Sequence, residues 1–391
     1  MPGTSKVPGK QRVSGQPPAV GAALLSIYAT LHMKRSHALL PSAILTALLA
    51  AVLLGNARTA RAAICPPQAA ASARESAQNE GLLCATSIAT GLFATPAPRS
   101  ASILAGARYG WVEDYARFYA APQPGAEWIR TASAGFFYGQ VRDQATGAGG
   151  QEWLKVWGNW MPARYFHQVP VSAFTGVEVN ARPPRPFGWL LREFETRAEP
   201  GGEAQPGAPV LQRYDFVQVY AKALGSDGAV WYDVGQGRWV RYHVLALLAW
   251  REQPRGLEPD EFWVDVDLSQ QTFAAYEGRR MVFAGLVSSG LARWPTRRGL
   301  FRVRRRYLTT PMAGGELGDD YYYIERVPHT VFFDGDIALH GAYWHDDFGR
   351  PKSHGCVNIA PRAAEWLYYW SMHAPGPLRV WVHNSHHSEF G

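Results

Sequence analysis

An internal repeat of short, alternating segments between residues 105 and 250 limits the fold of this chain more than any other sequence feature. Gly110-Trp111 recurs 78 positions later as Gly188-Trp189. Within each copy, polar and apolar residues alternate in short runs, and glycine and proline turns separate the runs. Alternation with a period of two indicates half-buried β-strands. We therefore expect a mainly β chain that contains two copies of one small unit.

Each unit holds about 60 residues, which is the size of a small barrel with a limited core. Trp160 of the first unit corresponds to Trp239 of the second, so the second copy carries one inserted residue. The pattern, at residues 105–169 and 185–250, resembles a bacterial Src-homology-type barrel, a module that is often fused to cell-wall enzymes. The repeated Trp and Tyr side chains would supply buried area in such barrels. The alternative is that a few of them line a groove for wall peptide or glycan.

The first 62 residues have the features of an export signal. Met33 begins a short basic segment, residues 39–54 are apolar, and residues 60–62 offer a small-x-small cleavage site. The apolar run is shorter than the about 20 residues that a membrane-spanning helix needs. We therefore expect a leader and signal peptide over residues 1–62, with the start at Met33. The alternative is an uncleaved anchor, which would associate the protein with the inner membrane.

The segments between and after the predicted units have compositions typical of connections. Residues 63–104 are rich in Ala and Ser and predict a low-complexity tether. Residues 170–186 and 252–259 contain several prolines and charged residues and predict two linkers. Residues 384–391 predict a polar tail.

The formal net charge of +7 belongs to the leader. Residues 1–62 hold seven Lys and Arg and no acidic residue, whereas the rest of the chain holds 32 basic and 32 acidic residues. A basic chain normally suggests nucleic acid or an anionic surface as a partner. Because the remainder is neutral, nucleic-acid binding loses its main support. The sequence also has no glycine-rich phosphate loop and no coiled-coil heptads.

The C-terminal part carries one cysteine, which follows a glycine in a turn and comes after two histidines of the same motif. Cys356 follows His354 by two residues and His340 by sixteen. A free thiol with a pKa of about 8.5 is only a few per cent thiolate at pH 7, and a nearby imidazole raises that fraction. Cys65 and Cys84 would form a disulfide in an oxidising compartment, a pairing that the sequence leaves open. That pairing would leave Cys356 as the odd thiol.

The pattern His-Gly followed by Ser-His-Gly-Cys resembles the catalytic signature of the L,D-transpeptidase family. Arg297 stands where the family's Pro-Thr-Pro-x-Gly-x-Phe turn usually has a second proline. Further blocks similar to the family follow in order along residues 259–383, at 262–268, 271–273, 276–278, 287–290, 295–301 and 360–368. The resemblance implies a β-rich catalytic domain with one or two helices, so that two small barrels would precede it in a mainly β chain.

The resemblance also implies a cysteine nucleophile with a histidine base. Cys356 would attack a peptide carbonyl and form a thioester, and His340 would take the thiol proton. The family orients this histidine with a main-chain carbonyl, and Gly341 occupies that place. The amides of Gly355 and Cys356 would form the oxyanion hole. His354 would shape the turn and add positive charge.

Four residues are candidates for substrate contacts. Ser353 and Asn358 belong to the motif, and Tyr343 and Trp344 resemble the aromatic wall of the family's donor pocket. For Asn358 the alternative is that it braces the site. Three consecutive tyrosines, residues 321–323, lie in an expected flap over the site. The sequence does not say which of them points inward.

A metal site is the alternative for this histidine cluster. His340, His345, His354 and Cys356 are zinc-ligand types. However, the sequence has no Cys-x-x-Cys pair and no His-x-x-x-His pattern on a helix, so we expect neither a metal nor a cofactor. In this interpretation His345 is an exposed loop residue.

Together these features predict an exported L,D-transpeptidase in the periplasm or cell wall, acting on peptidoglycan stem peptides. The resemblance implies attack on the third residue of a tetrapeptide stem, loss of the terminal D-alanine, and a 3→3 cross-link to a neighbouring amine. If water is the acceptor, the same site is an L,D-carboxypeptidase. If a protein lysine is the acceptor, it anchors a protein to the wall. An alternative from another class is a wall-binding protein in which the barrels carry the function.

Overall fold

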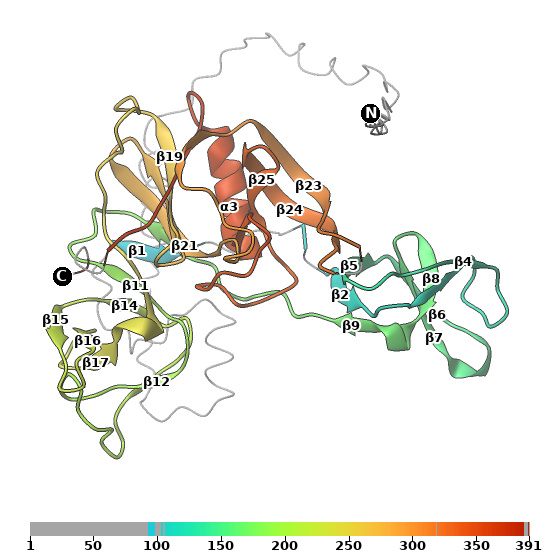
Figure 1. Cartoon of the computed structure of the whole chain (residues 1–391), viewed down its shortest axis with the longest axis horizontal. Helices are drawn as coiled ribbons and strands as arrows, with labels where there is room; N and C mark the ends of the chain where they lie inside the picture. The colour runs from blue at the N-terminus through green and yellow to red at the C-terminus, as the bar shows by residue number, and fades with distance from the viewer. Residues whose placement is uncertain (1–92, 98–102, 105, 318, 387–389, 391) are drawn as a thin grey trace, which may run out of the picture. The chain divides into compact units, whose positions relative to one another are not determined.

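The computed structural model describes residues 93–97, 103–104, 106–317, 319–386 and 390. The predicted leader and signal peptide, most of the predicted tether, and Cys65 and Cys84 lie outside these residues. The prediction of a mainly β chain is confirmed, because strands make up most of the regular structure (Figure 1). The described part contains one α-helix and three short 3-10 helices. None of its helices is long and apolar enough to cross a membrane.

The strands of the first repeat unit pair antiparallel with one another in two groups, and the first group belongs to the large sheet that also contains β24 (Tyr322–Asp334). In one, β2 lies between β5 and β9, and the other has the order β4-β3-β8-β7-β6. Val112, Phe118 and Met161 are fully buried at the centre of its core. The elements are β2 (Arg108–Val112), β3 (Arg117–Tyr119), β4 (Trp128–Thr131), β5 (Phe136–Val141), β6 (Asp143–Thr146), η1 (Ala148–Gly150), β7 (Glu152–Val156), β8 (Asn159–Pro162), η2 (Ala163–Tyr165) and β9 (Phe166–Gln168).

The second repeat unit pairs its strands in a similar way. Here β11 lies between β14 and β18, and β16 lies between β15 and β17. The elements are β11 (Phe187–Leu190), β12 (Phe194–Glu195), β13 (Val210–Leu211), β14 (Phe216–Gln218), β15 (Ala221–Leu224), β16 (Val230–Asp233), β17 (Trp239–Arg241), η3 (Tyr242–Val244) and β18 (Leu245–Leu248).

The repeat in the sequence is also a repeat of strand register. Gly110 pairs with Gly139 on β5, and Gly188 pairs with Val217 on β14, so both positions shift by 78 residues. On the other edge, Gly110 pairs with Gln168 on β9, and Gly188 pairs with Leu247 on β18. These two partners lie 79 residues apart, which accommodates the one-residue insertion. Whether either unit closes into a barrel stays a prediction.

The glycine shared by both repeats lies where two backbones approach closely. Replacing Gly188 with alanine is expected to destabilise the second unit by about 3 kcal/mol through overpacking. A Cβ atom there would lie 1.8 Å from the main-chain oxygen of Ala246. Urea unfolding followed by circular dichroism would measure the loss. Gly376→Ala is the control, because a Cβ at that position meets nothing within 4 Å. Equal midpoints for the two variants would contradict the close approach.

The C-terminal part continues as one large sheet with the order β22-β27-β19-β20-β21-β26-β25-β24, and β23 pairs with β24. β26 lies antiparallel to β21 and parallel to β25. The strands are β19 (Phe262–Asp267), β20 (Thr272–Glu277), β21 (Arg280–Ser288), β22 (Gly299–Arg302), β23 (Arg305–Gly314), β24 (Tyr322–Asp334), β25 (Ile337–Gly341), β26 (Val357–Ile359) and β27 (Arg379–His383).

The helix α3 (Pro361–Met372) lies against β24 and β25 (Figure 1). Pro361 occupies the first helical turn, where its missing N–H costs nothing and its fixed φ favours the helix. The buried face of α3 includes Ala363, Ala364 and Leu367, which join the largest apolar cluster of the sheet. This packing fixes the strand ends from which the cysteine motif projects.

Two predicted connections contain strands, which corrects their interpretation as loop and tether. β10 (Val177–Val179), within residues 170–186, pairs with β21, and β1 (Ala94–Pro96), within residues 63–104, pairs with β10. The Glu178 carboxylate accepts a hydrogen bond from Trp366 Nε1 of α3 at 2.8 Å. The edge of β21 supplies backbone partners that the sequence pattern of a short segment does not reveal.

His383, directly before the predicted polar tail, and Phe390 within it are both packed against other parts of the chain. His383 ends β27, its ring lies 4.0 Å from that of Trp381, and its Nε2 lies 2.5 Å from an Asp265 carboxylate oxygen. Although burial alone would lower it, the hydrogen bond to Asp265 raises the pKa of His383. Phe390 is fully buried in the core of the second unit. A single apolar residue in a polar segment gives no periodic signal, so the sequence did not predict this contact.

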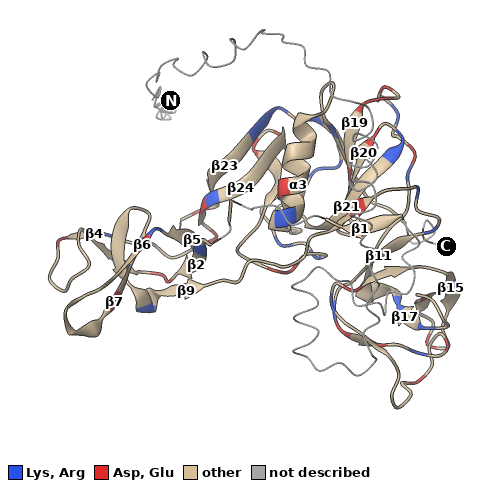
Figure 2. Ribbon diagram, turned by 180° about the vertical axis from the view of Figure 1, so that it is seen from behind, with Lys and Arg blue, Asp and Glu red and all other residues tan. Residues whose placement is uncertain are grey.

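Acidic and basic residues are interspersed along the described strands, as Figure 2 shows. Many of them pair with each other, including Arg251 with Asp265 and Asp267, and Arg142 with Glu325. This distribution agrees with the balanced composition outside the leader.

Candidate active site

The two halves of the motif meet because β25 and β26 are parallel neighbours. Leu339 pairs with Val357 and His340 with Asn358. Cys356 directly precedes β26, so its position is adjacent to β25 two residues before His340. The loop of residues 342–352 makes this parallel connection. The strand pairing therefore brings the sequence-distant histidine and cysteine to the same part of the sheet.

Cys356 is half-buried, and its thiol donates to the main-chain oxygen of Asp336 at 3.8 Å. Burial raises the pKa of the Cys356 thiol to about 11, because desolvation disfavours the thiolate. At neutral pH the group is therefore a thiol. It becomes a strong nucleophile only when a base removes its proton.

His340 is buried, with 2% of its surface exposed. Its Nδ1 lies 3.3 Å from the main-chain oxygen of Gly341. Burial lowers the pKa of His340 to about 4, and the Gly341 oxygen opposes this shift only in part. The imidazole is thus neutral at pH 7, and Nδ1–H donates to Gly341. That tautomer leaves a lone pair on Nε2, which is the form a general base requires.

The turn of residues 353–356 is held by two hydroxyl groups. Ser353 Oγ accepts from the Gly355 amide at 3.1 Å and donates to the main-chain oxygen of Cys356. Thr296 Oγ1 donates to the Gly355 oxygen at 2.8 Å and accepts from the Gly290 amide at 2.9 Å. Gly355 has a φ of 114°, which favours glycine. The Pro-Thr turn thus braces the cysteine turn.

These contacts correct the role expected for Ser353. Its side chain is buried and braces the turn, whereas the sequence suggested a contact with substrate. The Gly355 amide, predicted to belong to the oxyanion hole, donates to Ser353 in this structure. It would have to leave that hydroxyl before it could bind an oxyanion.

His354 lies between two aromatic rings. Its centroid is 4.0 Å from that of Trp294 and 4.9 Å from that of Tyr322. Its Nε2 lies 3.8 Å from the Asp320 carboxylate. Burial lowers the pKa of His354, and Asp320 opposes the shift. The ring is thus packed within the turn, and the lowered pKa disfavours the charged form that the sequence suggested.

Asn358 and His345 form a buried pair. The Asn358 amide lies 2.9 Å from His345 Nε2, and the Asp347 amide donates to His345 Nδ1 at 3.1 Å. Burial lowers the pKa of His345 to about 3, so the ring is neutral. The expectation that His345 is an exposed loop residue is therefore wrong, and in this structure Asn358 contacts the loop of residues 342–352.

The two residues of the predicted donor wall lie in different environments. Tyr343 is fully buried, its ring centroid lies 4.2 Å from that of Tyr109 in the first unit, and its hydroxyl donates to the Glu325 oxygen at 2.6 Å. The expectation that Tyr343 lines the donor pocket is therefore corrected to a packing role. Trp344 is half-buried, and its ring lies 5.6 Å from that of His340, so it remains a candidate wall residue.

Among the three flap tyrosines, Tyr322 faces the cysteine turn. It lies against His354, and burial together with the nearby Cys356 raises the pKa of its hydroxyl to about 12. Tyr321 and Tyr323 pack instead against the core of the first unit. The sequence located the flap but not the face of each tyrosine.

Sequence reasoning missed three residues around the turn, namely Trp294, Thr296 and Asp320. Thr296 belongs to the block of residues 295–301, which resembles the family's turn, and Trp294 directly precedes that block. Asp320 comes from the flap and reaches His354 across the site. In the part of the chain that the structure describes, no group of three or more His, Cys, Asp and Glu side chains is placed to hold a metal ion.

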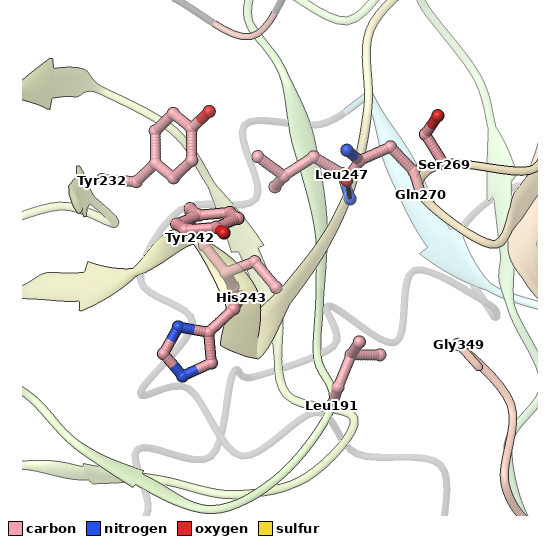
Figure 3. Close-up of a pocket in the computed structure, with 9 residues that line it drawn as sticks. Leu191, Tyr232, Tyr242, His243, Leu247, Ser269, Gln270 and Gly349 are labelled. Carbon is pink, nitrogen blue, oxygen red and sulfur yellow. Dashed lines mark hydrogen bonds between the residues drawn. The ribbon is translucent and has the colours of Figure 1, made fainter. Parts of the chain in front are cut away.

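A cavity of about 150 Å³ lies elsewhere, between the second unit and the C-terminal part (Figure 3). Tyr232, Tyr242 and His243 line one side, and Gln270 and Gly349 come from the other. None of the predicted catalytic or substrate residues lines this cavity. It is therefore separate from the cysteine site.

Residues 261–380 match the YkuD family, the L,D-transpeptidase catalytic domain. This part of the chain therefore matches the family that its motif predicted. The comparison with curated proteins gave no match.

Several solved structures are similar to this chain. An L,D-transpeptidase from Mycobacterium smegmatis shares 22% identity over 55% of this chain and 93% of that chain, with a TM-score of 0.30. One from Xylanimonas cellulosilytica shares 29% identity over 34% and 64%, with a TM-score of 0.27. One from Stackebrandtia nassauensis shares 23% identity over 35% and 60%, with a TM-score of 0.27. The chain spans 55% and 60% of the first two solved structures it matches.

Proposed function

We propose that this protein is an exported L,D-transpeptidase that forms 3→3 cross-links between peptidoglycan stem peptides. The observation that carries the proposal is the pairing of β25 with β26 inside the matched domain. It sets Cys356 beside a strand that carries a neutral histidine, and that histidine is oriented by the Gly341 oxygen. A thiol and an oriented imidazole are the two groups that covalent acyl transfer requires.

In the proposed reaction, Cys356 Sγ attacks the carbonyl carbon of the third residue of a tetrapeptide stem. His340 Nε2 accepts the thiol proton and passes it to the amine of the departing D-alanine. The C–N bond to D-alanine breaks and a thioester remains on Cys356. An amine of a neighbouring stem then attacks the thioester, His340 accepts its proton, and the thiol is regenerated.

The electrostatic environment supports this division of roles. Because burial raises the pKa of Cys356 and lowers that of His340, both groups are neutral before substrate binds. Proton transfer then coincides with attack on the carbonyl, and charge develops only in the transition state. Groups that stabilise charge in the transition state alone raise the rate without tightening substrate binding.

Export to the periplasm or cell wall belongs to the same proposal. Its support is the leader, which holds a basic start, an apolar run and a small-x-small site at residues 60–62. The mass of the protein recovered outside the cytoplasm would test it. A mature N-terminus at residue 63 agrees with a cleaved signal, whereas recovery only in the cytoplasm contradicts export.

The function is tested by incubating the full chain with purified disaccharide-tetrapeptide and identifying the products by mass. Dimers that lack one D-alanine are the expected result. If only tripeptide monomers form, water is the acceptor and the protein is an L,D-carboxypeptidase. If neither product forms while the folded protein stays intact, the wall-binding alternative is favoured.

A further inference from the structure

The flap strand β24 belongs to two parts of the molecule at once. Its last residues, Val331–Asp334, pair with β25 in the catalytic sheet. Its first residues pair with β23 on one edge and with β5 of the first repeat unit on the other. The β5 partners of Tyr322, Tyr323 and Ile324 are Phe136, Phe137 and Tyr138. The first unit therefore covers a strand edge that would otherwise expose unpaired N–H and C=O groups.

Side chains on the two faces of this segment contact different partners. The ring of Tyr323 lies 5.8 Å from Trp157, and that of Tyr321 lies 5.8 Å from Phe137. Both belong to the rim of the first unit's core. Tyr322, between them, lies 4.9 Å from His354 on the opposite face. Because side chains alternate along a strand, docking of the outer two tyrosines sets the position of the inner one.

Polar contacts hold the same strand at Glu325, the residue after Ile324. The Glu325 carboxylate accepts from the Gln140 amide at 3.0 Å and pairs with Arg142 at 3.1 Å. The main-chain oxygen of Glu325 accepts from Tyr343, whose ring packs on Tyr109. The main-chain amide of Gln140, the guanidinium of Arg142 and the ring of Tyr109 all belong to the first unit. The base of the flap is thus attached to that unit by backbone, charge and packing.

The free end of the flap has weaker attachments. Arg293 pairs with Asp319 at 2.7 Å, and both side chains are more than half exposed. Asp320 lies 3.8 Å from His354, beyond hydrogen-bonding distance. Exposed ion pairs contribute little to stability. The contacts with the first unit are therefore the ones that decide how firmly the flap stays over the cysteine turn.

We infer that the first repeat unit is a positioning element of the active site, which holds the flap closed and places Tyr322 against His354 beside Cys356. This inference deepens the proposed function, since it rests on Cys356 being the reactive thiol that the flap covers. Arg142, Glu325 and Tyr323 are the positioning residues, and none of them touches the reacting atoms. The unit acts on the site through the flap strand.

The test measures access to the thiol, which needs no turnover. The full chain is treated with iodoacetamide, and alkylation of the peptide that contains Cys356 is followed by mass spectrometry. Arg142→Ala is expected to speed alkylation by about five-fold, the size expected when one partly exposed charge-assisted contact is lost. Tyr323→Ala removes the ring contact with Trp157 and should speed alkylation by a similar factor. Arg142→Lys should restore most of the wild-type rate, because it keeps the charge beside Glu325.

Arg108→Ala is the matched control. Arg108 is an arginine of the same unit, but its Nη1 donates to Gln144 at 2.7 Å and not to the flap. It should alkylate at the wild-type rate. Hydrogen exchange adds a second readout: amides of residues 322–325 should exchange faster in Arg142→Ala, while those of β20 and β21 should not change. Faster exchange throughout the sheet would show unfolding and overturn the inference.

The outcomes separate this inference from the proposed function. If Arg142→Ala and Tyr323→Ala are alkylated faster but the wild-type chain forms no products from the tetrapeptide, the proposed function is contradicted and the positioning role is supported. Normal product formation with equal alkylation rates in all variants would overturn the positioning role and keep the function.

Discussion

Cys356→Ala is expected to remove the covalent adduct that a carbapenem leaves on the wild-type chain. It should also lower the rate of cross-linking by about 10⁴-fold or more, the scale on which loss of a nucleophile acts in covalent acyl transfer. The resemblance to L,D-transpeptidases implies that carbapenems acylate the same thiol as the stem peptide. Alanine keeps the turn, because the Ser353 and Thr296 contacts involve main-chain atoms of residues 355 and 356. Intact-protein mass after incubation with the drug measures the adduct.

Cys84→Ala provides the matched control, since it removes a thiol of the same chain that the motif does not contain. This variant should keep one adduct per chain. Two results would contradict the assignment of the nucleophile: an adduct that persists in Cys356→Ala, or the absence of an adduct on the folded wild-type protein.

The sequence predicted the elements around the thiol because local patterns determine them. Pro361 favours the start of a helix at its position in α3, and the apolar residues before His340 favour a buried strand such as β25. The repeated Gly-Trp pairs indicated equivalent strands in the two units, and the register confirms that equivalence. Each of these features depends on a short window of residues whose chemistry fits one backbone conformation.

The roles of individual site residues were harder to predict because they depend on distant partners. Tyr343 is buried by Tyr109, and Asn358 is held by His345 across the intervening loop. The alternation of Tyr321 to Tyr323 shows that two faces exist, but only the docking of β5 assigns each face to a neighbour. One sequence alone does not reveal which strands pair when they lie almost two hundred residues apart. The strand in residues 170–186 was missed for the same reason, since its partner is β21.

His340→Asn is expected to lower the acylation rate by about 10²- to 10⁴-fold at pH 7, the range for loss of a general base. Asparagine can still donate to the Gly341 oxygen from nearly the position of Nδ1, so the local structure is preserved. It has no basic nitrogen at the position of Nε2. Single-turnover acylation of the full chain by a carbapenem, measured from pH 4 to pH 10, would report the rate of this step.

The pH dependence distinguishes a base from a merely structural histidine. With a pKa of about 4 for His340, the wild-type rate should fall only near the acidic limit of this range and stay level above it. Without the base, the rate depends on the thiolate of Cys356, whose fraction rises about ten-fold per pH unit until the pKa of about 11. The ratio of the wild-type acylation rate to that of His340→Asn should therefore fall steadily as the pH rises.

His329→Asn is the control for this experiment. His329 is also buried, and desolvation lowers its pKa to about 4, but it packs against Tyr368 and Tyr369 of α3. It should keep the level profile even if its stability falls, whereas a level profile in His340→Asn would show that the imidazole is not the base.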